Sequence, residues 1–269
     1  MKLCVCGKGG SGKSTVVALL ANGFSRRGKE VVVLDSDESN SSLYWMLGLE
    51  RPPVPLMEMV GGKKSVQQKL MAKLASGAMD TPMSIWQMES ITTGAIPQEY
   101  VSVKPGRKLV ATGKILQSLE GCACPMGTVT KEFLKKFRPA ADEVVLVDME
   151  AGIEHFGRGV ETGVDGVLSV VEPSLESISL AAKVKELTES AGALYQGAVL
   201  NKIASPEQGR LVTDKLGGLG VSVLGAIGQN GDIQSACLEG KPLDSGVASA
   251  EVDGIVSALL QDGTGKPHP

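Results

Sequence analysis

Aromatic residues make up only 3% of this 269-residue chain, and its formal net charge is only -3. So few aromatic rings argue against a surface that stacks nucleobases. The small net charge gives no electrostatic reason to expect nucleic acid or an anionic membrane as a partner. No apolar run approaches the roughly 20 residues that span a bilayer, and the apolar run at residues 3–6 has the length of a strand rather than of a signal peptide.

Cysteine is also scarce. Five cysteines are an odd number, which argues against a disulfide framework and favours reduced thiols or metal ligands. Residues 261–269 cannot form the basic amphipathic helix that holds peripheral proteins on membranes. With 42% hydrophobic residues, the chain can bury a sizeable core. We therefore expect a cytoplasmic protein that binds neither membrane nor nucleic acid.

Strand and helix signals alternate along most of the chain. Short Val/Leu-rich runs typical of buried strands occur at residues 3–6, 31–34, 143–147, 166–171, 197–200 and 221–226. Helical periodicity occurs at residues 14–27, 130–137, 174–190, 206–216, 231–239 and 247–260. This alternation predicts an α/β fold, a doubly wound and mostly parallel sheet with helices on both faces.

Residues 51–121 break this rhythm, because they are rich in Met, Gly, Lys and Pro. We predict a helix at residues 65–74, and a hairpin or edge strands at residues 96–103 and 108–113. We interpret the segment as an insertion in a single domain that spans residues 1–269.

A glycine-rich loop follows the first predicted strand. Gly7, Gly12, Lys13 and Ser14 match the G-x-x-x-x-G-K-[ST] pattern of the P-loop, and the full loop reads Gly7-Lys8-Gly9-Gly10-Ser11-Gly12-Lys13-Ser14-Thr15. Such a loop wraps its N–H groups round a phosphate chain at a helix N-terminus. We expect Lys13 to reach the β/γ-phosphates and the Ser14 hydroxyl to bind Mg²⁺, so the loop predicts a P-loop NTPase.

Lys8 is a second lysine in this loop, at a place where an ordinary P-loop requires no cation. Its ammonium could stay solvated, or it could cross a dimer interface and neutralise the partner's nucleotide, as an arginine finger does. The loop resembles the deviant Walker A family of dimeric ATPases, which includes MinD, ParA and the nitrogenase iron protein. The resemblance implies that Lys8 is the intermonomer catalytic lysine.

Acidic residues follow two of the predicted strands. Asp35-Ser36-Asp37 ends the second strand, and Asp148 ends the strand at residues 143–147. At the carboxyl edge of a parallel sheet, such acids can hold Mg²⁺ and orient the attacking water. Asp37 matches the water-activating aspartate of the family. Asp148 matches the Walker B aspartate, and Gly152 could act as a hinge of switch II. A solvated acidic loop and a helix cap after a strand are the alternative interpretations.

Asn201 and Lys202 close another predicted strand. An Asn side chain offers both a donor and an acceptor, which suits the N6/N7 edge of adenine. The family uses an Asn-Lys pair here for the purine, so the resemblance implies that Asn201 and Lys202 contact the nucleotide base. A solvated strand end is the alternative.

Two pairs of cysteines share the spacing C-x-C. Cys4 and Cys6 alternate with Val5 in a predicted buried strand, so we expect both thiols to pack in the core, as we do for Cys237. Cys122 and Cys124 precede a helix predicted to begin near Thr130, and a helix N-terminus favours the metal-binding thiolate. One such pair supplies half of a tetrahedral site, and a twofold dimer would supply four thiolates. A buried or redox-active pair is the alternative.

Two segments together resemble the CooC family of ATPases, which help to insert nickel into carbon monoxide dehydrogenase. They are Glu120-Gly121-Cys122-Ala123-Cys124-Pro125 and the segment from Asp148 to Gly159, which contains His155. The resemblance implies a homodimer that hydrolyses ATP to ADP with Mg²⁺ and holds one Ni²⁺ or Zn²⁺ between its two pairs of Cys122 and Cys124. His155 is either a metal ligand, a partner contact, or a structural or hydrogen-bonding switch residue. The partner enzyme is carbon monoxide dehydrogenase or the related acetyl-CoA synthase.

Other functions within the deviant Walker A family predict different residues. An electron carrier like the nitrogenase iron protein needs a cluster cysteine in switch II, and residues 149–159 contain none. An iron–sulfur scaffold ATPase usually carries C-x-x-C, which is absent from the chain. A MinD/ParA-type positioning ATPase needs no thiol pair, and predicts a basic DNA-binding surface or a membrane helix.

Overall fold

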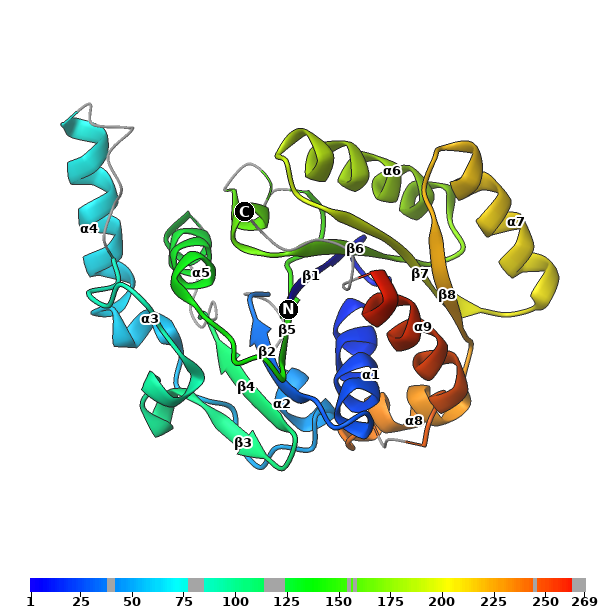
Figure 1. Ribbon diagram of the computed structural model, residues 1–269, viewed down its shortest axis with the longest axis horizontal. Coiled ribbons are helices and arrows are strands. Elements are labelled where there is room, and N and C mark those ends of the chain that lie inside the picture. The colour runs from blue at the N-terminus through cyan, green and yellow to red at the C-terminus, as the bar shows by residue number, and fades with distance from the viewer. Residues whose placement is uncertain are drawn as a thin grey trace.

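One sheet runs through the molecule. A computed structural model describes residues 1–37, 42–76, 85–113, 124–153, 156, 159–243 and 246–262. Within these residues, eight strands pair side by side (Figure 1) in the order β3 (Ser102–Lys104), β4 (Arg107–Ala111), β2 (Glu30–Asp35), β5 (Glu143–Asp148), β1 (Lys2–Gly7), β6 (Gly166–Val171), β7 (Tyr195–Ile203) and β8 (Val223–Gly228). Only β3 and β4 are antiparallel neighbours. The predicted α/β fold with a mostly parallel sheet is confirmed.

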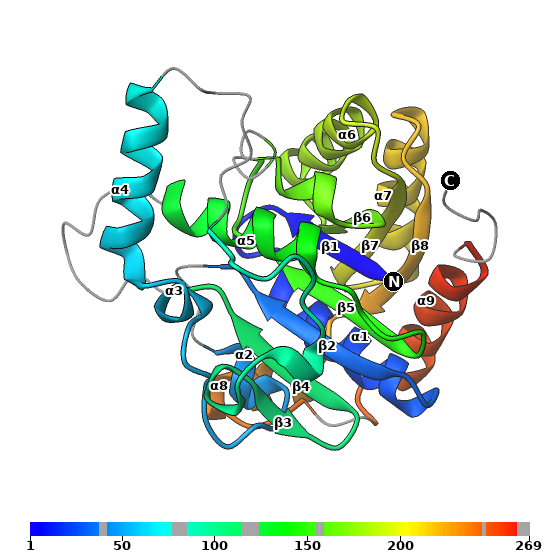
Figure 2. The ribbon, with the colours of Figure 1, turned by 60° about the vertical axis from the view of Figure 1, so that its left-hand side comes forward.

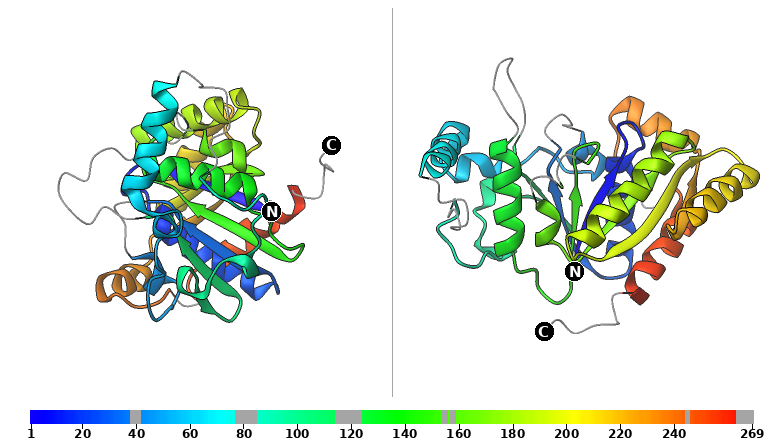
Figure 3. Two further views of the ribbon diagram at one scale, coloured as in Figure 1. Left: turned by 90° about the vertical axis from the view of Figure 1, so that its left-hand side faces the viewer. Right: turned by 90° about the horizontal axis from the view of Figure 1, so that it is seen from above.

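Helices cover both faces of this sheet (Figure 3). One face carries α1 (Lys13–Arg26), α2 (Leu43–Met46), α8 (Gly231–Glu239) and α9 (Ser249–Asp262). The other face carries α3 (Leu56–Met59), α4 (Gly62–Ala75), α5 (Cys124–Lys136), α6 (Leu175–Ser190) and α7 (Pro206–Gly218). Short 3₁₀ helices complete the described elements: η1 (Thr93–Ala95), η2 (Gln98–Tyr100) and η4 (Val160–Gly163).

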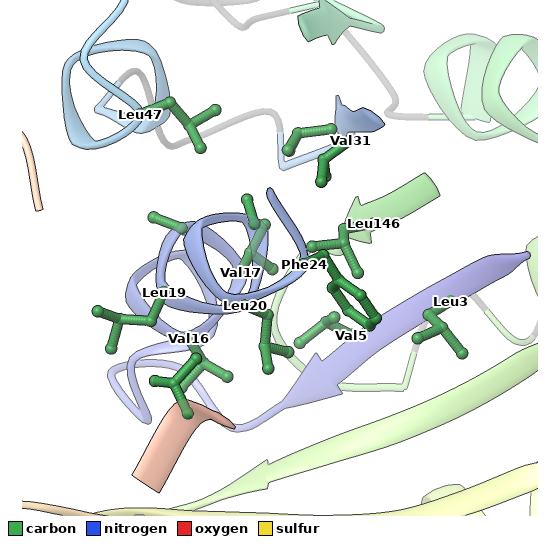
Figure 4. Close-up of a cluster of buried hydrophobic side chains, with 14 of the residues drawn as sticks. Leu3, Val5, Val16, Val17, Leu19, Leu20, Phe24, Val31, Leu47 and Leu146 are labelled. Atoms are coloured by element: carbon green, nitrogen blue, oxygen red, sulfur yellow. The ribbon is translucent and has the colours of Figure 1, made fainter. Parts of the chain in front are cut away.

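Alternation along β1 divides its side chains between two cores. Leu3 and Val5 pack against Phe24 of α1 on one face (Figure 4). Cys4 and Cys6 point to the opposite face, where both thiols are fully buried and their Sγ atoms lie 3.5 Å apart. The prediction that these two cysteines are core residues is confirmed, because strand alternation places both on one buried face. Cys237 is half-buried and packs at the edge of the α1 core.

The hairpin predicted within residues 96–113 is confirmed as the antiparallel pair of β3 and β4, but the bounds of its strands need a correction. Its first strand is only β3, which begins at Ser102, while residues 98–100 form η2. Pro97 lacks an N–H group for a sheet hydrogen bond, which explains the late start. β4 is not an edge strand, because it pairs with both β3 and β2. The segment at residues 51–121 therefore contributes an internal strand to the common sheet.

The helix that follows the C-x-C pair also differs from its prediction. We expected it to begin near Thr130, but α5 begins at Cys124. Pro125 is tolerated because the first turn of a helix needs no donor at that position. Cys124 is therefore the first residue of the helix rather than part of a preceding loop. Figure 2 shows α5 beside the projecting helix α4, and the two helices are in contact.

No helix in the part of the chain that the structure describes has both the length and the apolar character required to cross a membrane.

Candidate functional site

The P-loop joins β1 to α1 at the carboxyl edge of the sheet. Gly12 is the N-cap of α1 with φ 89°, and no side chain caps the helix there. The first turn of α1 also contains no acidic residue. The first N–H groups of the helix are therefore left to an external acceptor, and the helix dipole favours an anion at that point. This is the arrangement that binds a phosphate group.

Close packing fixes the shape of this loop. A Cβ atom on Gly12 would collide with Nδ2 of Asn201, and one on Gly7 would lie 2.5 Å from the Val170 carbonyl oxygen. Glycine is thus required at both positions for steric reasons as well as for its positive φ. The two glycines of the motif let neighbouring strands support the loop directly.

Asn201 and Lys202 brace the loop from β7. The Asn201 amide donates to the Ser11 carbonyl oxygen at 2.8 Å, and Lys202 Nζ donates to the Gly10 carbonyl oxygen at 2.5 Å. Lys202 reaches it from a left-handed backbone conformation with φ 61°. The sequence did not indicate this contact. The role of both residues in binding the purine stays a prediction.

A serine and an aspartate meet where the P-loop faces β5. Ser14 Oγ donates a hydrogen bond of 2.6 Å to Asp148 Oδ2. Asp148 is fully buried, and its other oxygen, Oδ1, has no hydrogen-bond partner among the residues that the structure describes. A buried carboxylate oxygen without a partner is costly unless a cation or a ligand binds there. This pair therefore fits the Mg²⁺ ion that the P-loop implies.

Two further carboxylates lie close to Asp148. Asp35 is its partner in the parallel register of β2 and β5, and the backbone N–H of Asp37 donates to Asp35 Oδ1 at 3.3 Å. Burial, and then the charge of Asp35, raise the pKa of Asp148 to about 7, while the hydrogen bond from Ser14 and the charge of Lys13 oppose the rise. The concentrated negative charge again favours a cation at this point.

The described residues form no preformed cage for a metal. Within them, no group of three or more His, Cys, Asp or Glu side chains is placed to hold an ion. Mg²⁺ typically keeps several waters and takes other ligands from phosphate oxygens, so one or two protein ligands suffice. The arrangement of Ser14 and Asp148 is consistent with a metal that arrives with the nucleotide.

The two lysines of the loop have different surroundings. Lys13 is buried, and its Nζ lies 3.4 Å from the Lys8 carbonyl oxygen, inside the curve of the loop. Lys8 is instead paired with two carboxylates, because its Nζ lies 3.2 Å from Glu172 and 3.0 Å from Glu176. Sequence reasoning missed both glutamates. The available signal was that Glu172 directly follows β6, at the same sheet edge as the P-loop.

The segment after β5 touches the P-loop directly. The Gly152 N–H donates to the Gly7 carbonyl oxygen at 3.2 Å, and Gly152 has φ 90°. A Cβ atom on Gly9 would lie 3.6 Å from that of Ala151. The predicted switch II segment is therefore in contact with the loop that would hold the phosphates.

The remaining predicted residues are placed as follows. Thr15 forms a hydrogen bond with the Cys237 thiol of α8. Burial raises the pKa of this thiol, and the hydrogen bond with Thr15 opposes the rise. Cys122 and His155 lie outside the described residues, and Cys124 is described only by its backbone, as the first residue of α5. The predicted metal site on the C-x-C pair thus stays a prediction.

Together, the sheet order, the braced glycine loop and the buried serine–aspartate pair define a P-loop NTPase. Residues 3–243 match the CobQ/CobB/MinD/ParA nucleotide-binding domain, and the chain belongs to this family. It is an ATPase of the MinD/ParA type.

Two relatives share most of its length. An uncharacterized ATP-binding protein of Methanocaldococcus jannaschii is 39% identical over 97% of this chain and 100% of its own. The carbon monoxide dehydrogenase accessory protein CooC of Rhodospirillum rubrum is 32% identical over 88% of this chain and 86% of its own. Among solved structures, the septum site-determining protein MinD of Pyrococcus horikoshii, complexed with Mg-ADP, matches with a TM-score of 0.67 at 16% identity, and the match covers 98% of this chain and 97% of that one. That likeness supports the fold.

Proposed function

We propose that this chain is an ATP-driven homodimeric metallochaperone that helps to insert nickel into carbon monoxide dehydrogenase. The observation that carries the proposal is the 32% identity to a carbon monoxide dehydrogenase accessory protein over 88% of the chain, combined with the sequence Cys122-Ala123-Cys124, whose last residue begins α5. Neither a positioning ATPase nor an ordinary NTPase needs a thiol pair at this place.

The nucleotide half of the proposed mechanism uses the described site. Lys13 and the N–H groups at the start of α1 would bind the β- and γ-phosphates, while Ser14 and Asp148 would hold Mg²⁺. Bound there, Mg²⁺ would neutralise charge on the transferred phosphoryl group. Asp37 orients the attacking water, and Lys8 of a second protomer stabilises the γ-phosphate in trans.

The thiol half uses a shared site. In a twofold dimer, Cys122 and Cys124 of both protomers supply four thiolates, enough for one tetrahedral Ni²⁺ or Zn²⁺ cargo ion. The N-terminal position on α5 favours the thiolate form of Cys124. The hydrogen bond with Cys6, and then burial, raise the pKa of Cys4 well above its ordinary value, so the Cys4 thiol resists the deprotonation that metal binding requires.

A packed helix links the two halves. α5 packs against η4, which follows the switch II segment. Gly163 of η4 fits against Leu134 of α5, and a Cβ atom on Gly159 would lie 2.9 Å from Lys131 Nζ. Because there is little free space between these elements, movement of switch II on loss of the γ-phosphate would displace the helix that begins at Cys124. That displacement would release the cargo ion.

Metal stoichiometry tests the proposal. The chain is purified without oxygen and loaded with Ni²⁺ or Zn²⁺, and the bound metal, sulfide and oligomeric state are measured. We expect about half an equivalent of metal per chain, the ratio for one four-thiolate site per dimer, and no sulfide. Apo-carbon monoxide dehydrogenase should gain activity with Ni²⁺ faster when the loaded protein and ATP are present.

Matched serine variants locate the site. Cys122→Ser and Cys124→Ser should each abolish tight metal binding, whereas Cys237→Ser, at a half-buried thiol on α8, should keep it. One full metal per chain that survives Cys122→Ser would contradict the shared site. A brown protein with iron and sulfide would instead indicate an iron–sulfur function.

A further inference from the structure

Two carboxylates of the same protomer bind the ammonium of Lys8. Its Nζ lies 3.2 Å from Glu172 Oε1 and 3.0 Å from Glu176 Oε2. Hydrogen bonds to Glu176 and then to Glu172 raise the pKa of Lys8, so the ammonium stays charged. The residue expected to act on another protomer is thus held by its own chain.

The two glutamates hold Lys8 in different ways. Glu172, at the carboxyl end of β6, is only 19% exposed and also contacts Lys202 Nζ at 3.4 Å. Lys202 in turn donates to the P-loop at Gly10. Glu176, in the first turn of α6, is 75% exposed, and Lys8 is its ion-pair partner among the described residues. Glu172 therefore also braces the loop, whereas the ion pair of Glu176 within the described residues is with Lys8.

One ammonium cannot bind these carboxylates and a second protomer's phosphates at the same time. We propose that Glu172 and Glu176 are positioning residues for Lys8: they hold it in its own protomer until the nucleotide phosphates of a second copy of this chain compete for it. This inference rests on the trans role of Lys8 in the proposed function. A nucleoside triphosphate offers a higher density of negative charge than two carboxylates, one of them largely exposed, which permits the exchange.

Removing the charge of Glu176 should therefore favour the dimer. The test compares the wild type, Glu176→Gln and the control Glu186→Gln by sedimentation, with Mg²⁺ and adenylyl imidodiphosphate, a non-hydrolysable ATP analogue. Glu186 lies on the same helix and pairs with Lys183 at 2.9 Å, away from the P-loop. A surface ion pair typically changes an equilibrium by about 1.4- to fivefold, and each dimer releases two of them. We expect Glu176→Gln to lower the dimer dissociation constant about two- to twenty-fivefold and Glu186→Gln to leave it unchanged.

Two readouts separate positioning from a merely structural role. With ATP, the protein concentration that gives half-maximal turnover should fall in Glu176→Gln, while turnover per dimer at saturation stays the same. The difference between Glu176→Gln and wild type should shrink as NaCl rises from 50 to 500 mM, since salt screens exposed ion pairs. Equal behaviour of Glu176→Gln and Glu186→Gln in the sedimentation assay would overturn the inference.

A direct probe of Lys8 distinguishes this inference from the proposed function. Acetylation of nucleotide-free monomers by acetic anhydride, followed by peptide mass spectrometry, should modify Lys8 faster in Glu176→Gln and in Glu172→Gln than in wild type. A chain that never dimerises with nucleotide would contradict the trans role of Lys8 in the proposed function. Unchanged labelling of Lys8 in both variants would contradict the positioning role even if the chain dimerises and binds nickel.

Discussion

Replacing Asp148 by Asn should stabilise the metal-free protein while removing its metal site. Burial, and then the charge of Asp35, raise the pKa of Asp148 from 3.8 to about 7. A carboxyl whose pKa is higher in the folded state binds its proton more tightly there, so its contribution to stability falls as pH rises from about 4 to about 7. The shift corresponds to about 4 kcal/mol of destabilisation above pH 7.

The Asn side chain avoids this cost but introduces a smaller one. Its amide oxygen can still accept the hydrogen bond from Ser14, which now goes to Oδ2 at 2.6 Å. Its amide nitrogen would lie where Oδ1 has no partner among the described residues, and a buried donor without an acceptor costs about 1–3 kcal/mol. The net expectation at pH 8 is a gain of about 1–3 kcal/mol in the free energy of unfolding.

Urea unfolding with EDTA at pH 5 and pH 8 measures this difference. The wild type should lose stability relative to Asp148→Asn between the two pH values, whereas Asp253→Asn, at an exposed pair with Arg26, should follow the wild type. Excess Mg-ATP should reverse the order, because a ligand at about 1,000 times its Kd stabilises the wild type by about 4.1 kcal/mol. A metal-free Asp148→Asn protein that is less stable than the wild type at pH 8 would refute this reasoning.

Four further predictions concern the site and the core. Lys13→Ala should lose ATP binding and hydrolysis together, whereas Lys8→Ala should keep nucleotide binding and lose turnover and dimerisation; equal loss of affinity by calorimetry would contradict the difference. Asp37→Asn should bind Mg-ATP yet hydrolyse it about 10²- to 10⁴-fold more slowly in a phosphate-release assay. Gly12→Ala should weaken nucleotide binding by about 1–3 kcal/mol, because φ is 89° there and the methyl group meets Asn201. Phe133→Ala should cost about 3–5 kcal/mol in urea unfolding, since this ring is buried and stacks on Phe137 at 5.0 Å.

The strands that carry the site could be predicted closely, because their residues are buried on both faces. β1, β2, β5 and β6 begin and end within a residue or so of the predicted runs. A strand covered on both sides must be apolar throughout, so composition alone reveals it. β3 and the start of α5 were less predictable, because a short edge strand and a proline-containing first turn leave no continuous apolar pattern.

The P-loop and the acids that end β2 and β5 were determined by the sequence itself. A glycine loop between a strand and a helix carries its own N–H donors for an anion, although contacts from β6 and β7 fix its shape. Alternation likewise decided that Cys4 and Cys6 lie on one face of β1. In each case the pattern itself lies within a few residues along the chain.

Only the tertiary structure decided which distant groups meet at that loop. Glu172 reaches Lys8 across 164 residues, and Asn201 reaches Ser11 across 190. These pairs meet because β6 and β7 follow β1 in the sheet and end at the same carboxyl edge. The order of strands in a sheet depends on the packing of the whole chain, and no local pattern near Glu172 or Glu176 encodes it. The ion pairs that hold Lys8 are therefore a property of the fold rather than of the motif.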